Sequence, residues 1–259
     1  QSLIQQHGIG QPTIAQLQSL PSKQRANYVL IVQDAFTTYY QAPLVIDFIR
    51  LCEKLGYTAV LLPFVPSGKA QHIKGFLRRY QHSAERMTQH LQQAAKTELP
   101  LIGIDPAVVL SLRDELQKIT RNSLNIPRVQ LPQEWLRSVI LQREAVQCDS
   151  EKRYYLLGHC TEKTQQPEST QQWQAIFQHV GAILEELPVG CCGMAGIFGH
   201  ERQNRQVSTA LYQLTWQQAI EHYGSKRCLT TGYSCRSQVK YQDDVTLLHP
   251  LQQLLMLLN

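Results

Sequence analysis

The sequence of 259 residues lacks the short motifs that mark common enzyme and metal sites. It contains no Gly-x-Gly-x-x-Gly element and no P-loop, so it gives no sign of a nucleotide site. It also lacks a Gly-x-Ser-x-Gly elbow and a His-Glu-x-x-His pair, which are the signatures of α/β-hydrolases and zinc peptidases. No Cys-x₂-Cys pair occurs, and this absence argues against a zinc ribbon and against the compact cysteine run of ferredoxins.

Strong charge and long apolar runs are also missing. The net charge is only +5, and the densest basic group is Lys74, Arg78 and Arg79. A solvated helix face explains that group better than a nucleic-acid surface, which normally shows a denser stripe, so we expect no nucleic-acid partner. No apolar run reaches the roughly 18–20 residues of a membrane span. Residues 245–258 are apolar, but His249-Pro250 interrupts them, and we expect a packed C-terminal helix there.

Cysteine is present in an odd number, seven, and no secretory signal precedes it. This combination argues against a disulfide framework and for a reducing compartment. We therefore expect a protein that is cytoplasmic, or peripheral to the inner face of the membrane. The chain begins with Gln1 rather than Met, which indicates a fragment or a processed piece.

Apolar runs alternate with amphipathic segments along the chain, and this order predicts βαβ units with parallel sheets. With 43% hydrophobic residues the chain can bury a substantial core, and its length favours two units of roughly 120 residues. The predicted fold is α/β, with two Rossmann-like parallel-sheet halves related by internal duplication. The predicted strands are 28–32, 58–62, 101–104, 154–157, 182–187 and 227–230, and the main predicted helices are 43–55, 72–96, 171–180 and 206–223, with another that ends at 116.

The duplication is visible in the residues themselves. Residues 32–37 align with 157–162, and residues 62–70 align with 187–195, both at an offset of 125. Residues 105–107 then align with 233–235 at an offset of 128. We expect a connecting segment at 1–26, a first half at 27–125 and a second half at 126–259. In this alignment the first half has no cysteine at the four positions where the second half has one: Ala35, Pro66, Ser67 and Ala107 face Cys160, Cys191, Cys192 and Cys235.

Those four cysteines are the predicted site. Cys191 and Cys192 lie in a glycine-rich turn, Pro-Val-Gly-Cys-Cys-Gly-Met-Ala-Gly, whose backbone can bring both thiols to one centre. Cys160 and Cys235 each follow an apolar run that predicts a strand, and open α/β sheets place ligands at the carboxyl ends of strands. Four thiolates suit a [4Fe–4S] cluster, with zinc as the alternative metal. The fold must gather them, because 30 and 42 residues separate them along the chain.

The other cysteines and two histidines carry weaker signals. Cys52 lies among apolar helix residues and Cys148 in a linker, so neither is expected to act in chemistry. Cys228 begins the last strand, and its expected role is either that of a core residue or that of an extra ligand. His159 and His200 flank the cysteine motifs; each is a structural residue or tunes the metal centre through a hydrogen bond.

The three elements His159-Cys160, Cys191-Cys192-Gly193 and Ser234-Cys235 resemble the cysteine-rich CCG domain. That domain occurs in heterodisulfide reductases, glycolate oxidase iron–sulfur subunits and related flavin-linked dehydrogenases. The resemblance extends from about Tyr28 to Lys240 and implies a duplicated Rossmann-like domain whose cysteines bind an iron–sulfur cluster or, in some members, zinc.

Three further phrases resemble the C-terminal portion of bacterial FAD-dependent D-2-hydroxyacid dehydrogenases, of the D-2-hydroxyglutarate and D-lactate type; they lie at 34–38, 103–106 and 112–115. The resemblance implies an FAD domain and a ferredoxin-like segment upstream in the same polypeptide. The chain departs from the family at Gly232, where the closing Cys-x-x-Cys would require cysteine. At most one four-cysteine cluster, or a zinc ion, is therefore expected.

The resulting hypothesis is an electron-transfer module that relays electrons from the upstream FAD, through one cluster, to an unknown acceptor. The fragment itself is expected to show no turnover and to contain no catalytic residue. A structural zinc-binding or metal-free interaction domain that docks on the flavin domain is the alternative. Thiol–disulfide chemistry at the Cys191–Cys192 pair remains a third possibility.

Overall fold

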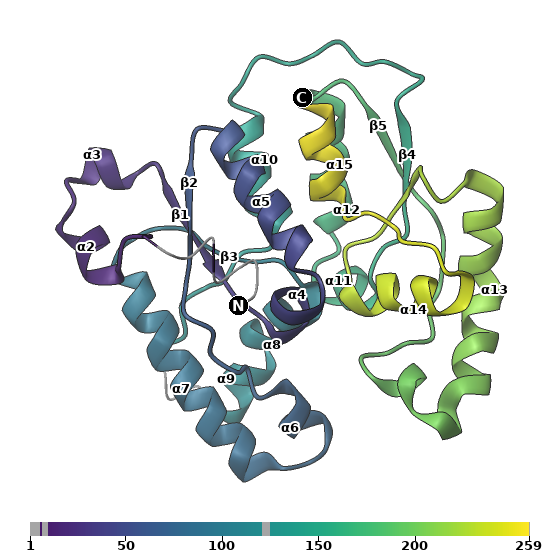
Figure 1. The fold of residues 1–259 in the computed structure, drawn as a ribbon, viewed down its shortest axis with the longest axis horizontal. Coiled ribbons are helices and arrows are strands. Elements are labelled where there is room, and N and C mark those ends of the chain that lie inside the picture. The colour runs from purple at the N-terminus through teal and green to yellow at the C-terminus, as the bar shows by residue number, and fades with distance from the viewer. Residues whose placement is uncertain (1–5, 7–9, 121–124, 259) are drawn as a thin grey trace. The chain divides into compact units, whose positions relative to one another are not determined.

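A computed structural model describes residues 6, 10–120 and 125–258 and divides the chain into two compact units, Gln1–Trp135 and Leu136–Asn259 (Figure 1). Each unit contains a three-stranded, entirely parallel sheet with helices around it. The expected α/β class with two Rossmann-like halves is confirmed.

The sheet of the first unit has the order β2-β1-β3. The central strand β1 (Tyr28–Val32) pairs with β2 (Thr58–Leu61) and with β3 (Leu101–Gly103). Four of the five residues of β1 are buried, as expected for a strand covered on both faces in a parallel sheet.

Helices precede, connect and follow these strands, and the last of them continues into the second unit. Their bounds are α2 (Ile14–Ser19), α3 (Ser22–Arg25), α4 (Ala35–Tyr40), α5 (Ala42–Lys54), α6 (Lys69–Ile73), α7 (Leu77–Ala95), α8 (Pro106–Arg113), α9 (Glu115–Ile119) and α10 (Pro132–Ile140). The helix expected at 72–96 is interrupted, because Gly75 takes a left-handed conformation with φ of 77° between α6 and α7.

Residues after position 125 complete the first sheet. Gln130 forms a parallel bridge with Ile102 of β3, and Val129 and Leu131 are buried in the core of this unit. This pairing explains why the first unit extends to Trp135.

The second unit repeats the arrangement with the order β5-β4-β6. Its strands are β4 (Arg153–Leu156), β5 (Ile183–Glu186) and β6 (Cys228–Leu229). Its helices are α11 (Cys160–Gln165), α12 (Ser169–His179), α13 (Arg205–Tyr223), α14 (Tyr233–Asp243) and α15 (Pro250–Leu257), with 3₁₀ turns η1 (Phe198–His200) and η2 (Arg202–Asn204).

The register of the two sheets matches the sequence repeat. Tyr28 pairs with Thr58, and Arg153 pairs with Ile183, so both partners differ by 125 positions between the units (153 − 28 and 183 − 58). Helices α7 and α13 occupy the same place in the order, and each has 19 residues. The bridge from Ile102 to Gln130 also has its counterpart, from Leu229 to Leu248.

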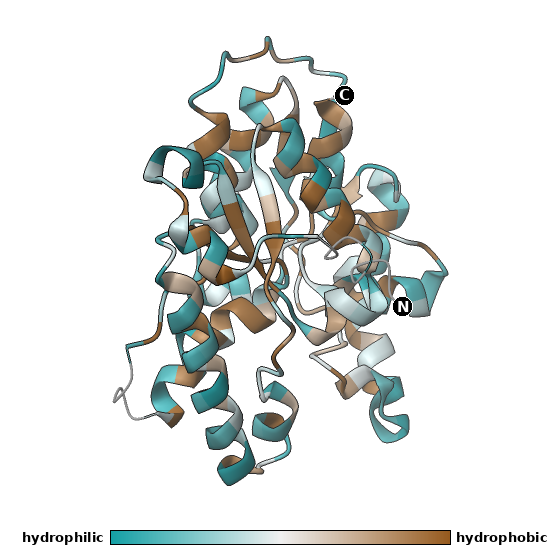
Figure 2. Cartoon of the chain, turned by 60° about the vertical axis from the view of Figure 1, so that its left-hand side comes forward, coloured by the Kyte–Doolittle hydropathy of each residue, from teal (hydrophilic) through white to brown (hydrophobic). Residues whose placement is uncertain are grey.

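Each unit has its own hydrophobic core. Hydrophobic residues concentrate on the strands, whereas the helices carry mixed or hydrophilic turns (Figure 2). On α7 the buried side is formed by Tyr80, Ala84, Met87 and Leu91, at helical spacing. In the part of the chain that the structure describes, no helix has the length and hydrophobicity required to traverse a bilayer.

Two leucines on α7 provide a matched test of the first core. Leu91 is fully buried and Leu77 is 53% exposed. We expect Leu91→Ala to lower the free energy of unfolding by about 2–5 kcal/mol, because it leaves a cavity. Leu77→Ala should change it by less than about 0.5 kcal/mol. Urea denaturation of both variants measures the difference, and equal effects would contradict the packing described for α7.

Candidate metal centre

The predicted ligands lie in the segments that follow the carboxyl ends of the three strands of the second unit. Cys160 begins α11 just after β4, Cys191 and Cys192 lie in the loop after β5, and Cys235 is the third residue of α14 after β6. Because the strands are parallel, these segments leave the sheet at the same edge. The helix starts also favour anionic sulfur, since the N-terminal end of a helix dipole is positive.

The four thiols lie together. Cys160 is in hydrogen-bonding contact with Cys191, Cys191 with Cys192, and Cys192 with Cys235. Cys160 and Cys235 also interact electrostatically. Cys160 is exposed and Cys191 half-buried, whereas the other two are buried. The fold thus brings together residues that are up to 75 positions apart (235 − 160).

The contacts form a series of neighbouring pairs. Within the described ranges, no group of three or more His, Cys, Asp or Glu side chains meets the arrangement required to hold a metal ion. The structure therefore shows four adjacent thiols, and metal binding by them remains a prediction.

Hydrogen bonding among the four thiols lowers the pKa of two of them and raises the pKa of the other two. The thiols of Cys160 and Cys192, with the Gly193 N–H at 3.4 Å, stabilise anionic sulfur at Cys191 and place its pKa far below the ordinary value. The contact with Cys192 likewise lowers the pKa of Cys235 to about 7 despite its burial. As the donors in these contacts, Cys160 and Cys192 have raised pKa values, and burial raises them further. Thiolate is the form of cysteine that binds metals, and Cys191 and Cys235 are the two thiols that favour it.

Helix α13 fixes the loop that carries the adjacent cysteines. Trp216 Nε1 donates to the Gly190 carbonyl oxygen at 2.9 Å, and Gly190 N–H donates to Thr215 Oγ1 at 3.1 Å. Gly193 has a φ of 88°, and a Cβ atom there would lie 2.2 Å from the Ser208 carbonyl oxygen. Only glycine therefore lets the chain turn this closely against α13 directly after Cys192.

His159 fills the space beside position 232. A Cβ atom on Gly232 would lie 2.2 Å from Cδ2 of the His159 ring. His159 is buried, and its Nδ1 has no hydrogen-bond partner among the described residues. This packing gives a physical reason for glycine at 232, where the CCG pattern would require a further cysteine.

Two buried charged residues hold the cysteine-bearing segments, and the sequence patterns did not identify either one. The carboxylate of Glu162 accepts hydrogen bonds from Ser169, at 2.7 Å, and from Thr231. Arg236 donates to the carbonyl oxygens of Thr230 and Thr231, at 3.0 and 2.8 Å. The bond between Glu162 and Thr231 links α11 to the segment between β6 and α14, and the Arg236 bonds tie α14 to that same segment. Neither residue belongs to a recognisable motif, and their spacing from Cys160 and Cys235 carries no signal by itself.

The remaining cysteines lie elsewhere. Cys52 is buried in α5 and burial raises the pKa of its thiol, while Cys148 is exposed. Cys228 lies in β6 within the second core, where burial raises its pKa to about 11. His200 lies 3.4 Å from Ser237 Oγ of α14.

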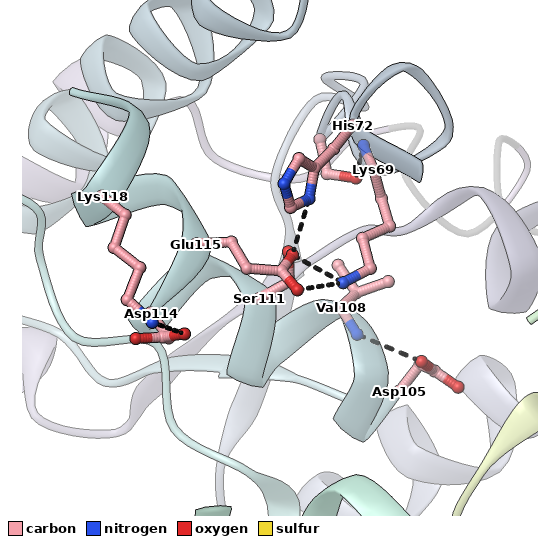
Figure 3. Close-up of polar contacts among 9 residues, drawn as sticks. Lys69, His72, Asp105, Val108, Ser111, Asp114, Glu115 and Lys118 are labelled. Atoms are coloured by element: carbon pink, nitrogen blue, oxygen red, sulfur yellow. Dashed lines mark hydrogen bonds and ion pairs between the residues drawn. The ribbon is translucent and has the colours of Figure 1, made fainter. Parts of the chain in front are cut away.

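The first unit places carboxylates where the second has His159 and Gly232. Asp34 caps α4 through the N–H groups of Phe36 and Thr37, and Asp105 caps α8 through Val108 N–H at 3.2 Å (Figure 3). The starts of α8 and α14 differ by 127 positions (233 − 106), which places Val108 rather than Ala107 opposite Cys235. Burial, together with the charge of Asp105, raises the pKa of Asp34 to about 6.

A second polar group at this edge ties α6 to α8 and α9. Glu115 accepts hydrogen bonds from Lys69, at 2.7 and 2.5 Å, and from Ser111 at 2.6 Å, and His72 Nδ1 lies 3.4 Å away (Figure 3). Burial raises the pKa of Glu115, but these hydrogen bonds outweigh burial and hold the pKa below its ordinary value. The first unit therefore fills its strand ends with helix caps and an ion pair, and no thiol lies there among the described residues.

The fold and the thiols define a duplicated α/β protein with cysteines gathered in one half. Comparison with known sequences then gives a specific relationship. The chain is 50% identical over 246 residues to D-2-hydroxyglutarate dehydrogenase of Pantoea ananatis, and 48% identical over 249 residues to that of Escherichia coli. It is 42% identical over 266 residues to that of Haemophilus influenzae. These matches cover 95%, 96% and 100% of the chain, but only 24%, 24% and 26% of the relatives.

The chain is thus a homologue of the C-terminal part of D-2-hydroxyglutarate dehydrogenases, and it spans about a quarter of their length. No protein-family model matches it. A crystal structure of a hypothetical protein from Helicobacter pylori is similar with a TM-score of 0.57 and 13% identity, over 93% of this chain and 50% of that one. That likeness concerns the fold alone.

The buried Asp34 predicts a measurable pH dependence. Its pKa of about 6 in the folded state exceeds the ordinary 3.8, so the folded state binds more protons than the unfolded state between these values. The free energy of unfolding should therefore fall by on the order of 1–3 kcal/mol as the pH rises from about 4 to about 6. Asp34→Asn keeps a capping oxygen and should remove most of this fall.

Urea denaturation between pH 4 and pH 7 measures the effect, with Asp149→Asn, at an exposed carboxyl, as the control. An unchanged pH profile in Asp34→Asn would show that Asp34 titrates at its ordinary pKa.

Proposed function

We propose that this chain is an iron–sulfur electron-transfer module of a D-2-hydroxyacid dehydrogenase. The observation that carries the proposal is the series of contacts that joins four thiols from three segments at one edge of the second sheet. Homology to D-2-hydroxyglutarate dehydrogenases supports a role in oxidoreduction.

The donor set fits a [4Fe–4S] cluster, because it consists of four cysteines, two of which already favour the thiolate form. Cys160, Cys191, Cys192 and Cys235 would hold the cluster, which when bound would carry one electron at a time. The Gly193 N–H donates to Cys191 sulfur, and such hydrogen bonds tune the reduction potential. The buried Met194 and Trp216 exclude water from the inner side of the site, while Cys160 faces solvent.

The wider reaction involves parts of the protein outside this chain. We propose that a D-2-hydroxyacid, D-2-hydroxyglutarate by analogy with the relatives, is oxidised on an FAD domain in the same polypeptide. A ferredoxin-like segment of that polypeptide would be the neighbouring electron carrier. The unknown acceptor would receive electrons through the exposed side of the site, at Cys160. Seven cysteines without a disulfide among the described residues support a reducing, cytoplasmic setting.

Anaerobic reconstitution of the chain with iron and sulfide tests the proposal. We expect about four iron atoms and four sulfides per chain, with a broad visible absorption band that bleaches on reduction. Cys192→Ser and Cys235→Ser should each lower the iron content severalfold. Cys148→Ser, at an exposed cysteine outside the cluster, is the matched control and should retain full iron content.

Iron far below stoichiometry in the unsubstituted chain, or equal iron in Cys192→Ser and Cys148→Ser, would contradict the proposal. Elemental analysis of freshly purified protein separates the alternative of a structural zinc site. Zinc that is retained in air and depends on the same four cysteines would favour that alternative.

A further inference from the structure

A cavity of about 490 Å³ lies in the first unit. Its lining residues are Val65, Pro66, Gln71, Arg78, Arg79, His82, Ser83 and Arg86. They come from the loop after β2, from α6 and from the first half of α7 (Figure 1). The loop leaves the carboxyl end of β2, the edge at which open α/β sheets bind ligands. Its volume falls in the usual range for small-molecule sites, roughly 300–1,000 Å³.

The cavity is strongly basic. Arg78, His82 and Arg86 follow one another at intervals of four residues, so they lie on one side of α7, with Arg79 beside them. No Asp or Glu is among the described residues that line the cavity. None of the described ion pairs involves Arg78, Arg79 or Arg86, whereas Arg25, Arg113, Arg128 and Arg153 are each paired with a glutamate.

The repeat shows that the fold does not require these charges. Helices α7 and α13 have equal length, and their starts differ by 128 positions (205 − 77). At this offset Arg78, Arg79, His82 and Arg86 correspond to Gln206, Val207, Ala210 and Leu214. All four counterparts are uncharged. The same helix in the same topology is therefore built without a basic stripe. Among the described residues no ion pair offsets the repulsion among Arg78, Arg79 and Arg86, although the Arg79 guanidinium lies 5.6 Å from the centre of the Phe76 ring.

The rest of the lining suits a small anion with an apolar body. Val65 and Pro66 supply apolar wall, and Pro66 stands at the position aligned with Cys191 of the second unit. Ser83 donates its hydroxyl proton to Gln71 Oε1 at 2.9 Å, so the NH₂ group of Gln71 remains the donor end of that side chain. Guanidinium groups bind carboxylate and phosphate oxygens bidentately.

We propose that this cavity, the Arg78–Arg86 pocket, binds a small anion that carries at least two negative charges, either an organic dicarboxylate or a phosphate compound. It lies in the half that lacks the four predicted ligand cysteines, and it gives that half a binding role separate from the candidate metal centre. The inference does not depend on the proposed electron transfer.

Isothermal titration calorimetry of the full chain in low-salt buffer tests the proposal, with 2-hydroxyglutarate, pyrophosphate and acetate as separate titrants. We expect saturable binding of 2-hydroxyglutarate or of pyrophosphate, with one site per chain, and at least tenfold weaker binding of acetate. Whichever of 2-hydroxyglutarate and pyrophosphate binds more tightly shows whether the pocket prefers a dicarboxylate or a phosphate compound.

Arg78→Gln/Arg86→Gln should weaken that binding at least tenfold, and Arg78→Lys/Arg86→Lys should weaken it less, because lysine keeps the charge but loses the bidentate geometry. The control Arg50→Gln/Lys54→Gln removes the same charge from exposed positions of α5 and should bind like the unsubstituted chain. Circular dichroism checks that all variants are folded.

The proposal is overturned if neither 2-hydroxyglutarate nor pyrophosphate binds, or if Arg78→Gln/Arg86→Gln and Arg50→Gln/Lys54→Gln lose binding equally. Vesicles containing phosphatidylglycerol serve as a further titrant, and binding of these vesicles alone would also overturn it. The last result would assign the basic stripe to a membrane surface instead.

Discussion

The direction of three strands is the constraint on which the rest of the second unit depends. Because β4, β5 and β6 are parallel, the segments that follow them leave the sheet at one edge. Cys160, the Cys191–Cys192 pair and Cys235 meet there although long helices separate them in the chain. Their sulfur atoms then interact directly, and the hydrogen bonds among them set which thiols favour the anionic form. No local loop could produce this arrangement, so the grouping of the four thiols depends on the integrity of the sheet.

The two units show how one topology supports different polar chemistry at the same edge. Equivalent positions hold Asp34 and Asp105 in the first unit, and His159 and Gly232 in the second. The carboxylates cap helices in the first unit, and burial together with the charge of Asp105 raises the pKa of Asp34. In the second unit the His159 ring occupies the space in front of Gly232, beside the thiols. The two sheets have the same strand order, and the pairing of β1 with β2 matches that of β4 with β5 at a constant offset of 125 positions. Divergence has changed the strand ends while the sheets have stayed alike.

Much of this architecture could be predicted from the sequence, because buried parallel strands are short apolar runs separated by helical segments. All six predicted strands occur, and the longest helices begin within a few residues of the expected positions. The short helices α4 and α11 were not predicted, since six polar or mixed residues have no helical periodicity of their own. The roles of Glu162 and Arg236 could not be predicted either. Glu162 accepts a hydrogen bond from Thr231, 69 positions away, and Arg236 donates to backbone carbonyl oxygens of the preceding loop, which have no signature in the sequence. The sequence favoured a solvated helix face for Lys74, Arg78 and Arg79; the pocket that includes Arg78 and Arg79 could not be predicted, because α6 and the loop after β2 contribute to its lining through tertiary packing.

The central claim is that four distant sulfur atoms form one ligand set. Titration of the fully reduced chain with Co²⁺ tests this claim most directly, because thiolate-to-cobalt charge-transfer bands report how many sulfurs bind one ion. The account predicts saturation at about one Co²⁺ per chain with a four-thiolate spectrum. It also predicts that Cys160→Ser and Cys235→Ser each reduce the sulfur count by one. A spectrum of two thiolates that is unaffected by substitution at position 160 or 235 would contradict it.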